Sequence, residues 1–336
     1  MTMKKTACIA LAAAFAAALA PYDMAAAPAR RATSRPAASP AAKSTAAKPA
    51  AAKPAAAPVQ TRYRKSPYVG ALSLDAVSGR TLFADNADVE AYPASITKLM
   101  TAFIVLDEVS AGRLKLTDQV TASPTRSRLD VHLRQPSCIG LKAGESMSVD
   151  DLLRVMLVHS ANDAAVFLAE KCSGSVDAFV HRMNAKAKSL GMTSTKFYNP
   201  NGLPPPRNAK ERNFNVSTCK DLALLARAIL AEHSNILRYT SIKTYEATLP
   251  NGTKQRFVNH NNVMVKDRLK VRNPDGSEAA DGLKTGYIDA GGSSVVLTGK
   301  RGGKRAIVVV LGSTSAAERD AKAAALLEDA LDTLSL

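Results

Sequence analysis

The chain has 336 residues, 46% of them hydrophobic, which is enough for one large folded domain or two small ones. Its formal net charge is +16, but eleven Lys and Arg and a single acidic residue fall within residues 1–65. The tail therefore carries +10 of the charge and residues 66–336 carry +6, so the strong basicity belongs mainly to the tail and not to the folded part.

Residues 1–27 have the pattern of a secretory signal peptide. Lys4 and Lys5 precede an apolar run that extends to about Ala20, and small residues then lead to a cleavage site near Ala27. The run is too short and too rich in Ala to predict a membrane span, although an uncleaved N-terminal anchor is the weaker alternative. The sequence therefore predicts export to the periplasm or the cell envelope.

Residues 28–65 are expected to form a disordered linker, because Ala, Pro, Lys, Arg, Ser and Thr dominate there and cannot bury a core. A cationic linker can associate electrostatically with an anionic wall or membrane surface, and it can equally be a solvated spacer. A nucleic-acid-binding tail would suit the composition but not an exported protein, so we expect no nucleic-acid partner.

Residues 66–336 are predicted to be the folded domain. Apolar alternation on both sides of a Ser-Gly turn predicts a hairpin over 68–83. Apolar residues at helical spacing predict a helix that begins at 93–95 and ends at 112. Ser148, with Asp151 three residues later, resembles a capping box that begins the next helix, which is expected to break at 160 and to restart near 163.

The second half of the domain is predicted to alternate helices, a long loop and strands. Helices are expected at 176–190, 221–231 and 315–334, a loop at 197–215, a hairpin around Asn251-Gly252, and strands at 282–287, 293–300 and 304–311. Short strands at both ends of a helical middle predict an α+β fold. We expect an antiparallel sheet built from both termini, with flanking helices and an inserted helical lobe.

Three short motifs follow one another in the chain: Ser95-Ile96-Thr97-Lys98, Ser160-Ala161-Asn162 and Lys284-Thr285-Gly286. Together they supply a nucleophile, a base, a proton relay and a cationic anchor for a carboxylate, which are the parts needed for acyl transfer through a serine ester. Ser95 and Lys98 share one face of a helix start, where free N–H groups favour the charge of a tetrahedral intermediate. Lys98 can act as a base only if burial and a second cation, such as Lys284, lower its pKa.

A structural interpretation competes with the catalytic one. Ser217-Thr218-Cys219-Lys220 repeats the first motif and is interpreted as a helix start without a catalytic role. By the same logic Ser95 could cap a helix, Ser160 to Asn162 could break one, and Lys284 could be a surface lysine. Three motifs in order, each at the edge of a predicted element, favour the catalytic interpretation.

With these motifs the chain resembles the serine D-Ala-D-Ala carboxypeptidase family, the low-molecular-mass penicillin-binding proteins. Residues 197–203, 217–223 and 281–287 are similar to the segments that accompany the family's motifs. The resemblance implies a β-lactamase/transpeptidase-like fold and no metal or organic cofactor. It also implies peptidoglycan stem peptides as substrates and β-lactam antibiotics as covalent inhibitors.

The resemblance further implies a role for each motif residue. Ser95 attacks the carbonyl of the penultimate D-Ala, Lys98 takes its proton and Ser160 relays a proton to the leaving amine, while Asn162 orders Lys98 and the substrate amide. The other substrate-binding residues lie on one predicted strand. Lys284 and Thr285 hold the terminal carboxylate of the substrate, and the backbone N–H groups of Ser95 and Tyr287 form an oxyanion hole. The strand residues are Lys284, Thr285, Gly286 and Tyr287.

Alternatives remain open at the level of the sequence. Short relatives of the family include endopeptidases that cut peptide crosslinks. A class A-like β-lactamase would need a deacylating glutamate, of which 211–215 is an imperfect match. A non-catalytic wall-binding protein would not need the intact motif set. Cys138, Cys172 and Cys219 have no spacing that predicts a pairing or a metal site, and each is expected to act as a small buried hydrophobe.

Overall fold

The structure is a computed structural model that describes residues 66–124, 137–205 and 209–336. The expected signal peptide and linker lie outside these residues. Contacts divide the chain after Pro54, and all described residues belong to the second unit, Ala55–Leu336. Within the described ranges, no helix combines the length and the apolar character required to cross a bilayer.

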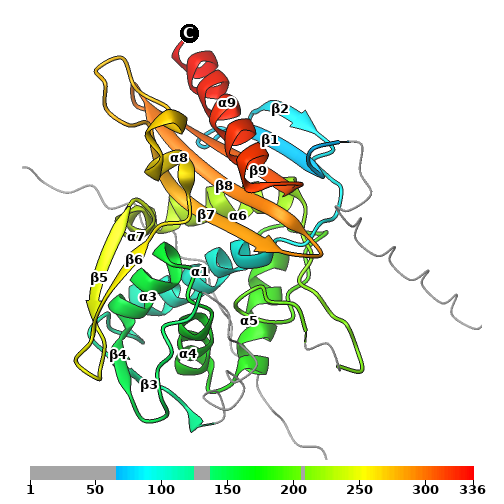
Figure 1. Cartoon of the computed structure of the whole chain (residues 1–336). Coiled ribbons are helices and arrows are strands. Elements are labelled where there is room, and N and C mark those ends of the chain that lie inside the picture. The colour runs from blue at the N-terminus through cyan, green and yellow to red at the C-terminus, as the bar shows by residue number, and fades with distance from the viewer. Residues whose placement is uncertain (1–65, 125–136, 206–208) are drawn as a thin grey trace, which may run out of the picture. The chain divides into compact units, whose positions relative to one another are not determined.

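A five-stranded antiparallel sheet joins the two ends of this unit (Figure 1). Its strands are β1 (Gly70–Asp75), β2 (Thr81–Asp85), β7 (Ala280–Ile288), β8 (Gly292–Arg301) and β9 (Lys304–Ser313). Their order is β2-β1-β9-β8-β7, with Gly70 of β1 opposite Leu311 of β9. The predicted strands and their union in one sheet are therefore confirmed. Since β7 lies at an edge, it has a sheet partner on one side only.

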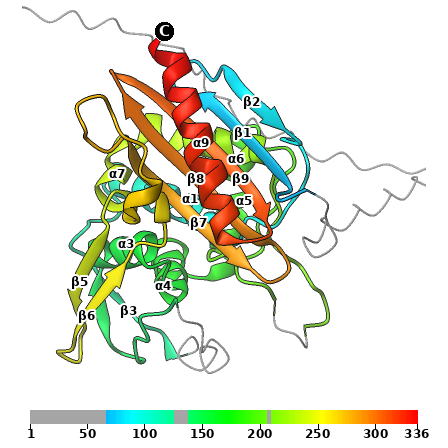
Figure 2. The same cartoon turned by 45° about the horizontal axis from the view of Figure 1, so that its top comes forward.

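Helices cover both faces of the sheet, which explains why its central strands are buried at nearly every position. Val308 of β9 packs in a cluster with Leu327 of α9 (Ala316–Ser335). The next residue, Val309, points to the opposite face and joins the larger cluster that includes α6 (Cys219–Glu232). Figure 2 shows α9 across one face of the sheet and α6 behind the other.

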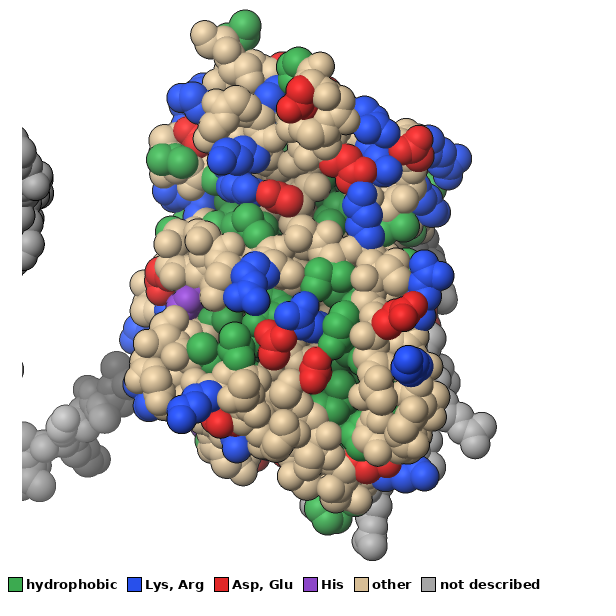
Figure 3. Space-filling view, turned by 90° about the vertical axis from the view of Figure 1, so that its left-hand side faces the viewer, with side chains coloured by type: hydrophobic (Ala, Val, Ile, Leu, Met, Phe, Trp, Pro, Cys, Tyr) green, Lys and Arg blue, Asp and Glu red, His purple; other side chains and the backbone are tan. Residues whose placement is uncertain are grey.

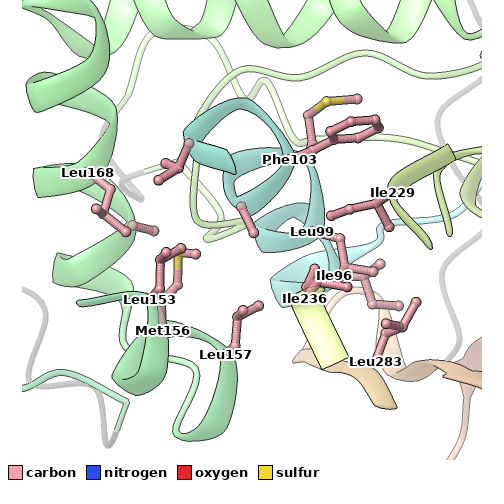
Figure 4. Packing of buried hydrophobic residues seen from close by; sticks show 14 of the residues in the cluster. Ile96, Leu99, Phe103, Leu153, Met156, Leu157, Leu168, Ile229, Ile236 and Leu283 are labelled. Atoms are coloured by element: carbon pink, nitrogen blue, oxygen red, sulfur yellow. The ribbon is translucent and has the colours of Figure 1, made fainter. Parts of the chain in front are cut away.

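The inserted lobe surrounds α1 (Lys98–Ser110) and is confirmed as helical. It consists of α3 (Val149–Val158), α4 (Asn162–Ser173) and α5 (Val176–Ser189). Figure 4 shows how side chains from α1, α3, α4 and α6 meet in one apolar cluster, among them Leu99, Leu153, Leu168 and Ile229. Because α1 is enclosed by other elements, it is apolar around most of its circumference.

Smaller elements complete the unit. They are β3 (Gln119–Thr121), β4 (Ser146–Ser148), η3 (Ser234–Ile236), α7 (Leu237–Thr240), β5 (Thr244–Thr248), β6 (Lys254–Val258), α8 (Asn262–Val265) and η4 (Asp267–Leu269). The predicted hairpin around Asn251 is the β5–β6 pair. The β3–β4 pair was not predicted, because three residues per strand are too few to show a period.

The predicted cap of α3 is confirmed. The hydroxyl of Ser148 accepts the N–H of Asp151 at 3.1 Å and caps α3. Cys219 is buried within the main apolar cluster, as expected, whereas Cys138 and Cys172 are only partly buried, so the expectation of a buried side chain was wrong for those two. Figure 3 shows the face with β5 and β6, where Lys and Arg side chains are interspersed with Asp and Glu.

Replacing Leu153 by Ala tests the packing of the lobe. Leu153 is fully buried, so the variant should lower the free energy of unfolding by about 2–5 kcal/mol, measured by urea titration. Val77→Ala is the control, because Val77 is 81% exposed and its truncation should change stability by less than about 0.5 kcal/mol. Equal effects of the two substitutions would contradict the described packing.

Candidate active site

Ser95 lies in a 3₁₀ turn, η2 (Ala94–Thr97), that leads directly into α1. Ala94 has φ 49°, a left-handed conformation that is costly for a residue with a side chain. Two glycines pack so closely against this turn that neither position has room for a side chain. A Cβ at Gly202 would overlap the carbonyl oxygen of Ala94, and a Cβ at Gly286 would lie 3.2 Å from the backbone nitrogen of Ser95. The position of the nucleophile is therefore set by close backbone packing.

Lys98 is fully buried and makes three contacts through Nζ. Its neighbours are the hydroxyl of Ser95 at 2.8 Å, Oδ1 of Asn162 at 2.7 Å and the carbonyl of Asn201 at 2.7 Å. Burial, and then the charge of Lys284, hold the pKa of Lys98 well below its usual range.

The three partners accommodate both protonation states of Lys98. An ammonium has three N–H groups and can donate to all three oxygens, including the hydroxyl of Ser95. A neutral amine has two N–H groups and one lone pair, so with Asn162 Oδ1 and the Asn201 carbonyl as acceptors its lone pair can accept the Ser95 proton. This arrangement can remove the proton of Ser95 without any histidine.

Ser160 and Asn162 lie where α3 ends and α4 begins. Ser160 is buried and has φ 68°, so the chain turns sharply there, as the predicted break requires. Asn162 begins α4 and bonds to Lys98, which places the second motif beside the first. The structure thus brings together residues that are 64 positions apart in the sequence.

The third motif lies on the edge strand β7. Lys284 and Thr285 are buried, Gly286 contacts the nucleophile turn, and Tyr287 is 62% exposed. Burial, and then the charge of Arg319, lower the pKa of Lys284 to about 7. A buried cation whose proton is held this weakly is suited to an anionic ligand, because a carboxylate would restore its charge.

Some residues of this region were not predicted to matter. The carbonyl of Asn201 has no residue-type signature, although the Asn-Pro-Asn-Gly segment around it was noted. Arg319 belongs to α9, is buried and is paired with Asp320 at 2.6 Å. His260 lies near the same cations. Desolvation, and then the charge of Lys284, lower the pKa of His260 to about 4, so its imidazole is neutral at pH 7.

One cluster away from the motifs has metal-ligand chemistry. Asp107, Glu232 and His233 place ligand atoms within 4.8 Å of one another. Lys186 already lies among them, with Nζ 3.2 Å from both carboxylates, and His233 Nε2 is 2.7 Å from Asp107. The lysine supplies the positive charge there, so the cluster is a charge network of the lobe.

A glycine-to-alanine pair tests how the nucleophile is positioned. Gly202→Ala and Gly144→Ala both place a side chain at positive φ, which costs about 1–2 kcal/mol of stability in each case. Only Gly202 faces the Ala94 carbonyl, whereas nothing lies within 4 Å of the site at Gly144. We expect acylation of Ser95 by a β-lactam to slow by roughly a hundredfold in Gly202→Ala alone. Equal acylation rates, measured by intact mass, would refute this role of Gly202.

The chain is similar to known D-alanyl-D-alanine carboxypeptidases. The peptidase S11 family, described as D-alanyl-D-alanine carboxypeptidase, matches residues 66–315. The chain is 34% identical over 259 residues to the D-alanyl-D-alanine carboxypeptidase DacF of Bacillus subtilis, covering 77% of this chain and 60% of the relative. It is 35% identical to DacC of Escherichia coli, covering 71% of this chain and 55% of the relative. The chain thus spans somewhat more than half the length of these curated relatives.

Solved structures of penicillin-binding proteins and of a DD-transpeptidase have a similar fold. Penicillin-binding protein D2 from Listeria monocytogenes in its cefotaxime-bound form has a TM-score of 0.65 and 32% identity, covering 79% of this chain and 97% of that chain. A mutant of the Streptomyces K15 DD-transpeptidase has a TM-score of 0.68 and 26% identity, covering 80% and 100%. The predicted transpeptidase-like fold is confirmed, and the chain belongs to the S11 family of D-alanyl-D-alanine carboxypeptidases.

Proposed function

We propose that this protein is a serine D-Ala-D-Ala carboxypeptidase that removes the terminal D-Ala of peptidoglycan stem peptides through an acyl-enzyme on Ser95. The observation that carries the proposal is the buried Lys98 amine, whose Nζ lies 2.8 Å from the Ser95 hydroxyl and whose pKa is lowered by burial and by the charge of Lys284. The S11 family membership supports the same reaction class.

Acylation begins when the hydroxyl proton of Ser95 passes to Nζ of Lys98. The freed Oγ bonds to the carbonyl carbon of the penultimate D-Ala, and the carbonyl oxygen becomes an oxyanion. Backbone N–H groups of Ser95 and Tyr287 are the proposed donors to that oxyanion, which is the interaction that lowers the barrier most. The close approach of Gly286 to the Ser95 nitrogen supports this assignment, because it brings the end of β7 beside the nucleophile.

The terminal carboxylate of the substrate is proposed to bind Lys284 and Thr285, with Arg319 behind them. Two buried cations repel each other, as the lowered pKa of Lys284 reflects. An anion between or beside them relieves that repulsion and is itself desolvated there, so the subsite favours a free C-terminal carboxylate. The free edge of β7 is available to pair with the backbone of an extended peptide.

Breakdown needs a proton on the leaving amine. Lys98 returns the proton it took, and Ser160 is proposed to relay it as the bond between carbon and nitrogen breaks. Water then attacks the ester on Ser95, with neutral Lys98 as its base, and the acyl group leaves with Ser95 protonated again. Apart from the attacking water, the groups of this mechanism are side chains and backbone N–H groups of this chain.

We further propose that β-lactams acylate Ser95, because they present an amide and a carboxylate in the arrangement of the substrate. The cefotaxime-bound and ampicillin-bound forms of the similar Listeria protein support this. Residues 1–27 are proposed to direct export to the cell envelope, where the basic segment 28–65 would associate with an anionic surface.

A β-lactamase reading has less support. Its deacylating glutamate would be Glu211, but that carboxylate is exposed and accepts a hydrogen bond from Asn213 at 2.7 Å. A DD-endopeptidase uses the same acylation chemistry and differs in the leaving group, so product analysis separates it from a carboxypeptidase.

The decisive experiment compares the full chain with Ser95→Ala on a D-Ala-D-Ala pentapeptide and on a crosslinked dimer. Release of D-Ala from the pentapeptide, read by mass spectrometry, should fall by at least about a thousandfold in the variant, because no other group can form the ester. Penicillin should give a long-lived adduct with the unmodified protein. Unchanged D-Ala release by Ser95→Ala would refute the nucleophile, exclusive cleavage of the dimer would favour an endopeptidase, and rapid penicillin turnover would favour a lactamase.

The pKa of Lys284 predicts a pH dependence. In the free enzyme Lys284 is charged below about pH 7 and neutral above it, so kcat/KM should fall as pH rises through that value. Lys284→Arg keeps a cation that does not titrate in this range, so the alkaline fall should disappear. Lys304→Arg, at the exposed first residue of β9, should keep the original profile. An unchanged alkaline fall in Lys284→Arg would assign that titration to another group.

A further inference from the structure

The strand β7 gives the proposed peptide-binding site a direction. Lys284, Gly286 and Ile288 share one face of the strand, because alternate residues of a strand point to the same side. Gly286 lies against the Ser95 turn, while Lys284 and Ile288 lie about 7 Å before and after it along the strand. If the substrate carboxylate lies at Lys284, as the proposed function holds, the acyl-donor arm must leave Ser95 toward Ile288.

An aromatic platform lies at the Ile288 end. Tyr92 and Ile288 form a small buried cluster against which Phe214 packs, and the rings of Tyr92 and Phe214 are 4.6 Å apart. Tyr92 comes directly before the Pro-Ala-Ser of the nucleophile turn, and a Cβ at Gly291 would lie 2.9 Å from its side chain. The platform is therefore fixed relative to Ser95.

Arg212 lies over this platform. Its guanidinium carbon is 5.6 Å from the centre of the Phe214 ring, and its charge opposes the rise that burial causes in the pKa of Tyr92. Arg212 is exposed, and it takes part in none of the ion pairs formed among residues 66–124, 137–205 and 209–336. The neighbouring carboxylate, Glu211, bonds instead to Asn213.

A guanidinium that rests on an aromatic face loses some of its freedom and keeps the N–H groups at its edge available. Those groups can form a bidentate pair with the two oxygens of a carboxylate. We propose that Arg212, held over Phe214 and Tyr92, binds a carboxylate on the acyl-donor arm of the substrate. This inference rests on the proposed function, and it makes the Ile288 end of the proposed peptide-binding site selective for stem peptides that carry a free acid upstream of the scissile bond.

The test uses two peptides that end in the same D-Ala-D-Ala and differ only in one upstream side chain, which is a carboxylate in one and its amide in the other. The unmodified protein should have a kcat/KM roughly tenfold to a hundredfold higher for the acid, as expected for a charge-assisted hydrogen bond. Arg212→Gln should lose this preference, mainly through KM, and keep its activity on the amide. Arg212→Lys should keep part of the preference.

Arg80→Gln is the matched control. It removes the same charge from an exposed site in the β1–β2 turn, at the far edge of the sheet from β7, and should keep the full preference for the acid. The inference is overturned if the unmodified protein treats both peptides alike, if Arg212→Gln slows both equally, or if Arg80→Gln has the same effect. Absence of D-Ala release from both peptides would overturn the proposed function as well, whereas equal turnover of the two would overturn the subsite alone.

Discussion

The rest of the site depends on one uncharged amine that is buried between two oxygen acceptors. The pKa of Lys98 is lowered there, because its side chain is removed from water and faces the charge of Lys284. In the neutral form, Asn162 and the Asn201 carbonyl accept both of its N–H groups, so the lone pair is directed toward Ser95. Burial therefore favours the form of Lys98 that the proposed base needs, and the two acceptors orient it.

The fold can be understood as the means of bringing these groups together. The turn η2 carries Ser95, α1 begins with Lys98, the start of α4 supplies Asn162, and β7 supplies Lys284, the proposed cationic anchor. Each segment is held by its own apolar contacts, α1 within the lobe and β7 against β8. The motif residues meet where the lobe adjoins the edge of the sheet, so neither part contains the complete set by itself.

Residues with a fixed spacing could be predicted from the sequence, whereas residues supplied by backbone or by distant helices could not. Ser95 and Lys98 share a turn, and Lys284 to Tyr287 share a strand, so their types and spacing reveal them. The Asn201 carbonyl has no signature, because every residue has a carbonyl. Arg319 reaches Lys284 only because α9 packs on the sheet, which no local pattern encodes.

The pairing of β1 with β9 has a consequence for how the protein matures. β1 cannot find its central partner until the whole helical lobe and the two preceding strands have emerged, because β9 follows them in the chain. Contacts between such distant segments form late and slowly. The edge strand β7, which carries Lys284, is joined to this late assembly through β8. A partly synthesised chain therefore holds Ser95 and Lys98 but lacks the strand that completes the proposed site.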